Sequence, residues 1–483
     1  MPEPTLFELS QPGKRCVELP ESDLPELEPG WIAPDQLRDE PPGLPQVSEP
    51  EIARHFAQLA TENLNVDANF YPLGSCTMKY NPKVNEEIAA SPHWSRLHPE
   101  TPEEHVQGAL RLMFELECWL AEILGLPAVS LHSPAGAAGE FTALRVFRAC
   151  LESRGDARAR VIVPDTAHGT NPASVTRCGY ESTNIASNER GRIDLEELAD
   201  ALDEDVAALM LTNPNTLGLF ETDVLEITRM VHEVGGFVYC DGANLNAIMG
   251  YARPGEMGFD AVHVNLHKTF STPHGGGGPG AGPVAVTEEL ESFLPIPRLV
   301  ERDGQFAWDR DRPQSIGTVH SFFGNFLVMV RAWAYILSMG AEGLRQASSD
   351  AVLNANYLMR ALEDRWELPY AGPCMHEFVL SAEGIRKETG LRAADFAKRL
   401  LDFGIHPPTM YFPIIVDEAL MIEPTETESL RTLDRFIEVM LRLADEADEL
   451  PERLGEAPAR TSVGRVDEVK AARDLILRWS ENS

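Results

Sequence analysis

Short apolar runs alternate with amphipathic stretches from about residue 100 to about residue 290, and this is the strongest pattern in the chain. The apolar runs are rich in β-branched residues and cover 159–165, 206–215, 235–243, 260–268 and 282–287. Between them, stretches such as 194–202 and 226–234 space their apolar residues as a helix does. Strands separated by helices are typical of βαβ units, so we predict an α/β fold with a mostly parallel sheet.

The flanking regions have a different texture. Residues 1 to about 50 are rich in proline, and a helical stretch starts at Glu49. An amphipathic helix is predicted over 108–125, ending at Gly125, and helical patterns return at 327–340 and 428–450. The length suits about three units of roughly 150 residues. We expect an N-terminal arm with an extended segment (1–95), a large domain (96–330) and a smaller α+β C-terminal domain (331–483).

Polar residues follow directly after four of the predicted strands. They are Asp165 to His168, Asn213 to Thr216, Asp241 to Asn244 and Asn265 to Thr269. Open α/β sheets bind ligands beyond the carboxyl ends of their strands. We therefore expect these residues to meet at one site.

Lys268 is the most informative of these residues, because the chain has only seven lysines and this one ends an apolar strand. A buried lysine amine loses its proton readily and can form a Schiff base with a carbonyl cofactor. Asp241, at the end of the preceding strand, could pair with a protonated pyridine nitrogen. Together these residue types indicate a pyridoxal phosphate site.

A phosphate group would find its donors in the small-residue turn 133–140, which precedes a helical pattern over 140–155. Helix N-termini offer free N–H groups and a positive dipole end. His168 could lie flat against the cofactor ring. Each feature alone is more often a surface lysine, a turn, a helix cap or a structural histidine. Their order along the chain is what favours a site. The glycines at 275–278 lack the P-loop ending and indicate little.

The charge excludes some partners. There are 41 basic and 76 acidic residues, giving a net charge of −35, so nucleic acid and anionic membranes are disfavoured. The seven cysteines form no C-x-x-C pair, the N-terminus lacks signal-peptide features, and no apolar run approaches the roughly 18 residues of a membrane span. We expect a cytoplasmic protein. The shortage of lysine with excess acid suits a salt-rich cytoplasm, which is a hypothesis about habitat.

Metal binding has little support in the sequence. His93, His98 and His105 offer three imidazoles, but they lack a tightly spaced ligand pair and a cysteine partner. We therefore predict no metal site.

Taken together, seven segments resemble the glycine-decarboxylating P-protein family of the glycine cleavage system, in subunit 2 of its two-subunit form. The segments are 69–86 (NFYPLGSCTMKYNPKVNE), 133–140, 165–175, 213–221, 241–247, 264–283 and 315–326. The resemblance runs from about residue 50 to about residue 430. It implies a pyridoxal-phosphate fold-type I (aspartate aminotransferase-like) architecture.

The resemblance also implies roles for individual residues. Pyridoxal 5'-phosphate would be held as a covalent aldimine on Lys268, with Asp241 on the pyridine nitrogen and His168 stacked on the ring. The other cofactor-binding residues it implies are Gly136, Ala137, Ala138, Thr216, Ala243 and His267. Ala138 stands where relatives often have a larger polar residue, and Thr318 and His320 stand where many have basic ones.

The implied reaction is the decarboxylation of glycine on the cofactor, followed by transfer of the aminomethyl group to the oxidised lipoyl arm of H-protein. The implied assembly is a heterotetramer of two subunits 1 and two subunits 2. Lys268 or His168 could move protons. The segment Ser75 to Lys79 could line the pocket or the lipoyl entrance, or could serve only as a structural contact of the arm. A cysteine desulfurase, with Cys76 as nucleophile, another decarboxylase and a silent scaffold subunit remain as alternatives.

Overall fold

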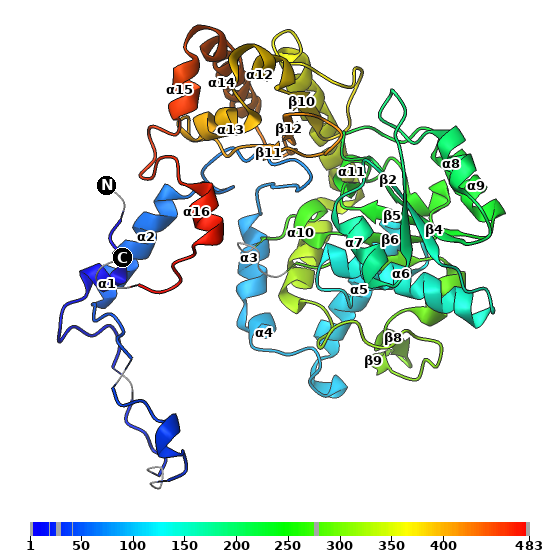
Figure 1. Ribbon diagram of the computed structural model, residues 1–483. Helices are drawn as coiled ribbons and strands as arrows, with labels where there is room; N and C mark the ends of the chain where they lie inside the picture. The colour runs from blue at the N-terminus through cyan, green and yellow to red at the C-terminus, as the bar shows by residue number, and fades with distance from the viewer. Residues whose placement is uncertain (1–2, 19, 26–29, 41, 275–279, 480–483) are drawn as a thin grey trace. The chain divides into compact units, whose positions relative to one another are not determined.

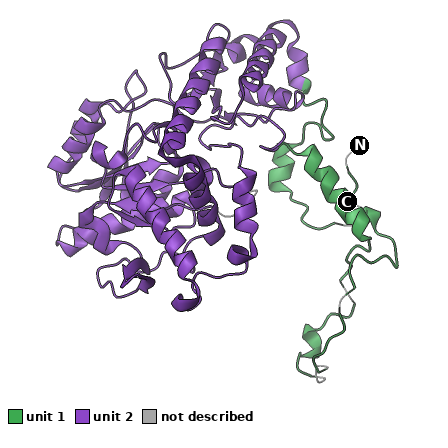
Figure 2. Ribbon diagram, turned by 180° about the vertical axis from the view of Figure 1, so that it is seen from behind, with its two compact units in different colours: residues 1–64, 456–483 green, residues 65–455 purple. Residues whose placement is uncertain are grey.

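The computed structural model describes residues 3–18, 20–25, 30–40, 42–274 and 280–479. The chain divides into two compact units (Figure 2). One unit joins residues 1–64 to residues 456–483, and the other contains residues 65–455.

A seven-stranded sheet is the centre of the larger unit, with strand order β1-β7-β6-β5-β4-β2-β3 (Figure 1). The strands β2 to β6 run parallel, whereas β7 is antiparallel to both β6 and β1. The predicted mostly parallel sheet is confirmed. The strands are β1 (Ala128–Ser130), β2 (Arg160–Pro164), β3 (Glu181–Ile185), β4 (Val206–Thr212), β5 (Phe237–Gly242), β6 (Ala261–Val264) and β7 (Val284–Val286).

Helices cover both faces of this sheet, because its inner strands are apolar on both sides. In β4, Leu209 and Leu211 join one apolar core while Ala208 and Met210 join the other. One face is covered by α6 (Gly136–Ser153) and α7 (Thr170–Arg177). The opposite face is covered by α5 (Gln107–Leu124), α8 (Leu195–Ala201) and α9 (Val224–Glu233). Helix α5 ends at Gly125, whose φ of 69° suits a left-handed cap, as its sequence predicts.

The smaller C-terminal domain has its own core and a three-stranded antiparallel sheet of order β10-β12-β11. Its strands are β10 (Phe378–Ser381), β11 (Thr409–Met410) and β12 (Ala419–Ile422). Its helices are α12 (Glu383–Thr389), α13 (Ala393–Leu401), α14 (Leu430–Glu449) and α15 (Pro451–Glu456). The α/β large domain with a smaller C-terminal domain agrees with the predicted fold class.

Helix α11 (Phe326–Leu362) connects the two domains and is broken at Gly340, where φ is 62°. Among the described residues it is the one helix long and apolar enough to cross a membrane by length and composition. It packs against α5, α14 and the short helix α3 (Lys83–Ala90), and 44% of its most apolar window is buried. These contacts are those of a core helix in a folded domain.

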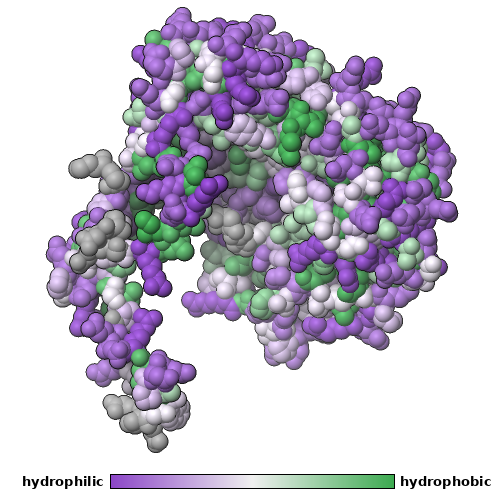
Figure 3. Space-filling view, in the orientation of Figure 1, coloured by the Kyte–Doolittle hydropathy of each residue, from purple (hydrophilic) through white to green (hydrophobic). Residues whose placement is uncertain are grey.

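Several connections form short elements. The hairpin of β8 (Arg298–Arg302) and β9 (Gln305–Asp309) packs on α5. The others are α4 (Pro92–Ser95), α10 (Leu266–Thr269), η2 (Glu103–His105), η3 (Leu245–Ala247), η4 (Pro254–Met257) and η5 (Glu288–Phe293). The face seen in Figure 3 is mainly hydrophilic, in keeping with the net charge of −35.

The smaller unit contains α1 (Leu6–Leu9), η1 (Pro34–Gln36), α2 (Glu49–Glu62) and α16 (Glu468–Arg473). Helix α2 begins at Glu49 as predicted, and Ser48 and Glu51 form a capping box at its start. The rings of Phe7 and Trp479 stack at 4.8 Å between centroids, which joins the two ends of the chain within this unit.

Candidate active site

A cavity of about 180 Å³ lies where the carboxyl ends of the parallel strands meet the N-terminus of α6. Eight of the nine residues predicted for the cofactor site line it: Gly136, Ala137, His168, Thr216, Asp241, Ala243, His267 and Lys268. The ninth, Ala138, is not a lining residue, and its carbonyl accepts a hydrogen bond from Thr142 Oγ1 at 2.7 Å. Polar residues from four separate strand ends therefore come together as their positions predicted.

Lys268 reaches the cavity from α10, the single turn that follows β6. Its Nζ donates a hydrogen bond to the backbone carbonyl of Ser75 at 2.9 Å. Ser75 belongs to the extended segment before α3 and lines the same cavity. Within the segment from Ser75 to Lys79, Ser75 lines the cavity, whereas Lys79 bonds Asn246 and Glu426 outside it.

Asp241 ends β5 and is 3% exposed. Its carboxylate accepts hydrogen bonds from Asn171 Nδ2 and from the backbone N–H of Ala243, both at 3.0 Å. Burial alone would raise its pKa, but the nearby His263, the bond from Asn171 and the charge of Lys268 outweigh burial and lower the pKa of Asp241. The site thus holds a buried carboxylate in its charged form.

His263 and Glu140 also line the cavity, and the sequence reasoning missed both. His263 Nε2 lies 3.6 Å from Asp241 Oδ1, and its Nδ1 bonds the hydroxyl of the fully buried Tyr239. Glu140 accepts hydrogen bonds from Thr170 Oγ1 at 2.6 Å and Ser174 Oγ at 2.7 Å. Burial and the negative Asp241 raise the pKa of Glu140. The sequence carries one signal for His263, which is that a histidine stands inside the otherwise apolar strand β6.

His168 follows β2 and lines the cavity, with its Nδ1 2.9 Å from Thr170 Oγ1. Burial and the charge of Lys268 lower its pKa, so it is a neutral imidazole near pH 7. The hydroxyl of Thr216 donates a hydrogen bond to the carbonyl of Thr166 at 2.6 Å, so toward a ligand its Oγ1 can act only as an acceptor. The ring-stacking role of His168 and the polar role of Thr216 stay predictions.

The turn before α6 approaches the end of β6 closely. A Cβ at Gly136 would lie 2.4 Å from Asn265 Nδ2, and a Cβ at Gly282 would lie 2.1 Å from the carbonyl of Ala135. Backbone excludes a side chain at Gly282, and a side chain at Gly136 would require Asn265 to move. The first two residues of α6, Gly136 and Ala137, line the cavity, and the first N–H groups of a helix have no partner within the helix. Burial, together with His274 and Lys268, lowers the pKa of His267 to about 3. His267 is therefore a neutral hydrogen-bonding group in this wall.

Thr318, His320 and Cys76 are not among the residues that line this cavity. Thr318 and His320 are exposed. Cys76 Sγ contacts His274 Nε2 at 3.2 Å, and burial raises the pKa of the thiol, which does not suit the mobile nucleophile of a desulfurase. The glycines at 275–278 lie outside the described residues.

His93, His98 and His105 are exposed and do not form a ligand group in the part of the chain that the structure describes. One group of suitable ligand atoms does occur there, formed by His376, Glu377 and Glu423. All three are buried, and they are considered separately below.

The residues present fit pyridoxal 5'-phosphate. They combine an amine, a charged carboxylate for a pyridinium and a helix N-terminus for a phosphate around one cavity. In addition, Thr212 Oγ1 is buried in the cavity wall and has no hydrogen-bond partner among the described residues. An unpaired buried hydroxyl is costly, and a polar ligand would relieve that cost.

Two solved structures have a fold similar to that of this chain. The chain resembles a crystal structure of glycine decarboxylase (P-protein) of the glycine cleavage system, with TM-score 0.71 and 22% identity over 85% of this chain and 93% of that one. It also resembles Oryza sativa TDC with PLP and tryptamine, with TM-score 0.65 and 14% identity over 88% of this chain and 92% of that one. These likenesses establish the fold-type I architecture.

The sequence comparisons establish the family. The family described as "Glycine cleavage system P-protein" matches residues 23–305, and "Glycine dehydrogenase, C-terminal domain" matches residues 347–463. Proteins named "Probable glycine dehydrogenase (decarboxylating) subunit 2" are 56% identical in Caldanaerobacter subterraneus subsp. tengcongensis and in Oceanobacillus iheyensis, in each case over 99% of this chain and 98% of the relative. The chain therefore belongs to the P-protein family of the glycine cleavage system.

Proposed function

We propose that this chain is the pyridoxal-phosphate-bearing subunit of a glycine dehydrogenase (aminomethyl-transferring, decarboxylating). The single observation that carries the proposal is the cavity in which Lys268, Asp241 and the N-terminus of α6 meet. A silent scaffold subunit would not need an amine, a charged carboxylate and a phosphate cradle in one place.

The cofactor, when bound, supplies an electron sink for the electron pair left when the bond between Cα and the carboxylate of glycine breaks. Lys268 would supply the amine that binds the cofactor carbonyl. Asp241, held in its charged form, would favour a protonated pyridine nitrogen and so would maintain the sink. The N-terminus of α6, starting at Gly136, would hold the phosphate with help from His267.

His168 and Lys268 are the two groups placed to move protons at the reacting carbon. A neutral imidazole can accept a proton, and burial keeps the pKa of His168 low enough for that.

The proposed partners are subunit 1, in a heterotetramer with two copies of each chain, and lipoylated H-protein. H-protein would bring the oxidised lipoyl disulfide that accepts the aminomethyl group, one sulfur bonding the carbon and the other leaving as a thiol. We place the protein in the cytoplasm, because its seven cysteines are all free.

The test is the exchange of labelled bicarbonate into the carboxyl group of glycine, with the purified chain, subunit 1, H-protein and pyridoxal phosphate. We expect exchange only when all components are present, and none with Lys268→Ala. The absorbance band of the bound cofactor should also disappear in Lys268→Ala. Wild-type protein that gives no exchange with all components present would contradict the proposed function, and an unchanged band would contradict the role of Lys268.

A further inference from the structure

Residues 73–79, here called the strap, lie along the C-terminal domain, and Ser75 within them lines the cavity. Leu73 bridges to Ile422 of β12, and the N–H of Gly74 donates to the carbonyl of Met421 at 3.3 Å. Thr409 Oγ1 donates to the carbonyl of Gly74 at 2.6 Å. The approach is too close for a side chain, because a Cβ at Gly74 would lie 2.2 Å from Met421 Cγ. The strap is thus fixed to the small sheet.

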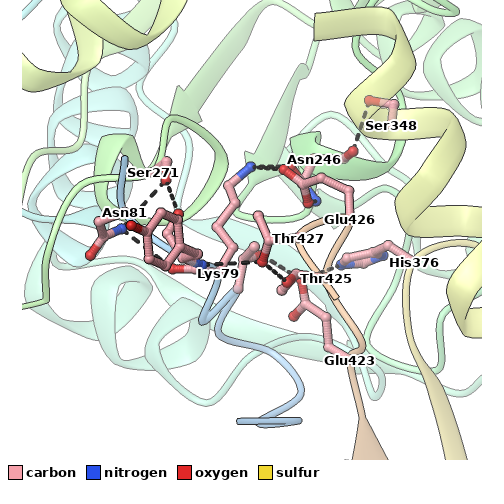
Figure 4. A network of polar contacts seen from close by, with 12 residues as sticks. Lys79, Asn81, Asn246, Ser271, Ser348, His376, Glu423, Thr425, Glu426 and Thr427 are labelled. Carbon is pink, nitrogen blue, oxygen red and sulfur yellow. Dashed lines mark hydrogen bonds and ion pairs between the residues drawn. The ribbon is translucent and has the colours of Figure 1, made fainter. Parts of the chain in front are cut away.

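The far end of the strap is fixed as firmly. Lys79 is 2% exposed, and its Nζ donates to Glu426 Oε1 at 2.6 Å and to Asn246 Oδ1 at 2.7 Å. Thr77 Oγ1 donates to Glu423 Oε1 at 2.5 Å. Figure 4 shows Lys79 of the strap beside Asn246 of η3 and Glu426 of the segment after β12. Between the two fixed ends lies the Ser75 peptide.

Ser75 contacts a buried carboxylate on one side and the cofactor lysine on the other. Its N–H donates to Glu377 Oε2 at 2.7 Å, and its carbonyl accepts from Lys268 Nζ at 2.9 Å. Its φ is 61°, a left-handed conformation that costs a non-glycine residue about 1 kcal/mol or more and persists only when neighbours enforce it. The two hydrogen bonds are the contacts that enforce it here.

Glu377 is completely buried just before β10, and no lysine or arginine pairs with it at ion-pair distance in the described structure. The groups that face it are His376 beside it, Glu423 after β12, Lys268 of α10 and Cys76 of the strap, with Asn244 Nδ2 at 3.3 Å. Burial raises the pKa of Glu377 to about 7. Burying such a carboxyl is costly, and the bonds from the Ser75 N–H and from Asn244 Nδ2 offset part of that cost, the Ser75 bond being the shorter.

We propose that Glu377 is a positioning residue for Lys268, acting through the Ser75 peptide. Glu377 holds the N–H of Ser75, which turns the Ser75 carbonyl toward Lys268 and keeps the amine at the cavity. The C-terminal domain thereby sets the position of a lysine on the large domain. This inference rests on the proposed function only in giving Lys268 the role of cofactor lysine.

The test measures the reactivity of Lys268 in cofactor-free protein by reductive methylation with formaldehyde, read by peptide mass spectrometry. Lys83 is exposed and serves as the internal reference in each sample. In Glu377→Ala, the loss of about one hydrogen bond should raise the methylation rate of Lys268 about 5-fold relative to Lys83. Glu377→Gln keeps an oxygen acceptor for the Ser75 N–H and should restore the rate to within about twofold of wild type.

Glu221→Gln is the matched control. Glu221 is also buried, its pKa is also raised by burial, and it also accepts a backbone N–H, from Ile193 at 2.9 Å, but it lies outside the cavity wall. This variant should leave the Lys268 rate unchanged. Thr409→Val loosens the strap without touching Glu377, so it should raise the rate in the same direction and keeps the proposal testable if Glu377→Ala does not fold.

A second readout is the absorbance of the cofactor-loaded protein against pH. The pH midpoint of the band should shift in Glu377→Ala and be restored in Glu377→Gln, which a general loss of packing would not produce. Folded Glu377→Ala and Thr409→Val proteins with wild-type Lys268 rates would overturn the proposal. A stoichiometric divalent metal that is present in the purified wild-type protein and absent from Glu377→Gln would also overturn the proposal, because the Glu377 carboxylate would then be a metal ligand. Methylation needs neither glycine nor H-protein, so a failure of bicarbonate exchange leaves its result intact.

Discussion

Two buried carboxyl sites lie near Lys268, and the pKa values of their carboxyl groups shift in opposite directions. Asp241, at the end of β5, is surrounded by donors, and its pKa is lowered despite burial. For Glu377 and its neighbour Glu423, the effect of burial is larger than that of the hydrogen-bond donors. The pKa of Glu377 therefore rises to about 7, and the pKa of Glu423 rises well above its ordinary value. Both sites are almost fully buried, so burial does not explain the difference.

The difference comes from the partners that the fold supplies. Asp241 has an amide, a backbone N–H and a nearby imidazole. Glu377 and Glu423 have one strong donor each from the strap and repel one another, while both ring nitrogens of His376 lack a partner among the described residues. The contacts of Asp241 favour a negative charge that could pair with a pyridinium. The contacts of Glu377 favour a protonated carboxyl, which accepts the N–H of the Ser75 peptide.

The substitution expected to have the largest effect is Asp241→Asn, which keeps the shape of the side chain and removes its negative charge. The activity should fall by about 10²–10³, the usual cost of losing one preorganised electrostatic contact in an active site. Bicarbonate exchange measures it. Asp260→Asn is the control, since Asp260 is also a buried aspartate that pairs with a histidine, His232, and bonds the backbone at Val238. An equal loss in Asp260→Asn would show that the effect is structural.

The pH dependence of stability should have opposite signs at the two sites. Because the folded-state pKa of Glu377 is raised to about 7, its contribution is fully present below about pH 4 and is lost as the pH rises to about 7. Relative to Glu377→Gln, wild-type protein should lose on the order of 3 kcal/mol of unfolding free energy across that window. Asp241, with a lowered pKa, should stabilise above about pH 4 and lose that contribution in more acidic solution.

Urea unfolding at pH 5 and pH 8 measures the first effect. Thermal melts below pH 4, compared between wild type and Asp241→Asn, measure the second. A difference between wild type and Glu377→Gln that stays constant from pH 5 to pH 8 would contradict the assignment of a proton to Glu377.

Asn171 is the side-chain donor that stabilises the charged form of Asp241 by a direct hydrogen bond. Asn171→Ala removes the amide that bonds Asp241 Oδ2 at 3.0 Å, a bond to a charged group worth about 1.5–3 kcal/mol. The exchange rate should therefore fall about tenfold or more, with a matching loss of cofactor affinity in an absorbance titration. Asn356→Ala, which removes an amide bonded to the backbone carbonyls of Val352 and Cys374, is the control. Equal exchange rates in the two variants would show that Asn171 has no specific role in the reaction.

The Asp241 site could be predicted from the sequence because it is built from strand ends. Asp241, His168 and Lys268 each follow an apolar run directly, and a parallel sheet brings such positions to one edge. The edge strand β3 escaped prediction because its residues, Glu181–Ile185, are polar and mostly exposed, so no apolar run marks them. The strand β1 has only three residues and gives no periodicity.

The Glu377 site could not be predicted in this way, since it depends on contacts across the whole fold. Ser75 is separated from Lys268 by 193 residues and from Glu377 by 302. No local pattern relates these segments, and a glutamate next to a strand is ordinarily a surface residue. Only the unusual polar segment around Ser75 gave a signal, and by itself it left a pocket wall and a structural contact equally open.

The smallest expected effect concerns the donor that Glu423 receives from the strap. Thr77→Val keeps the shape and removes the hydroxyl that bonds Glu423 Oε1, so the unfolding free energy should fall by about 1 kcal/mol. That hydroxyl stabilises the ionised carboxylate, and its loss should raise the pKa of Glu423 further and make the destabilisation larger at pH 9 than at pH 6. Urea unfolding at both pH values measures it, with Thr176→Val, an exposed helical threonine, as the control. A destabilisation independent of pH would mean that Thr77 supports the strap by packing alone, and the contrast between the two carboxyl sites would then rest on Glu377.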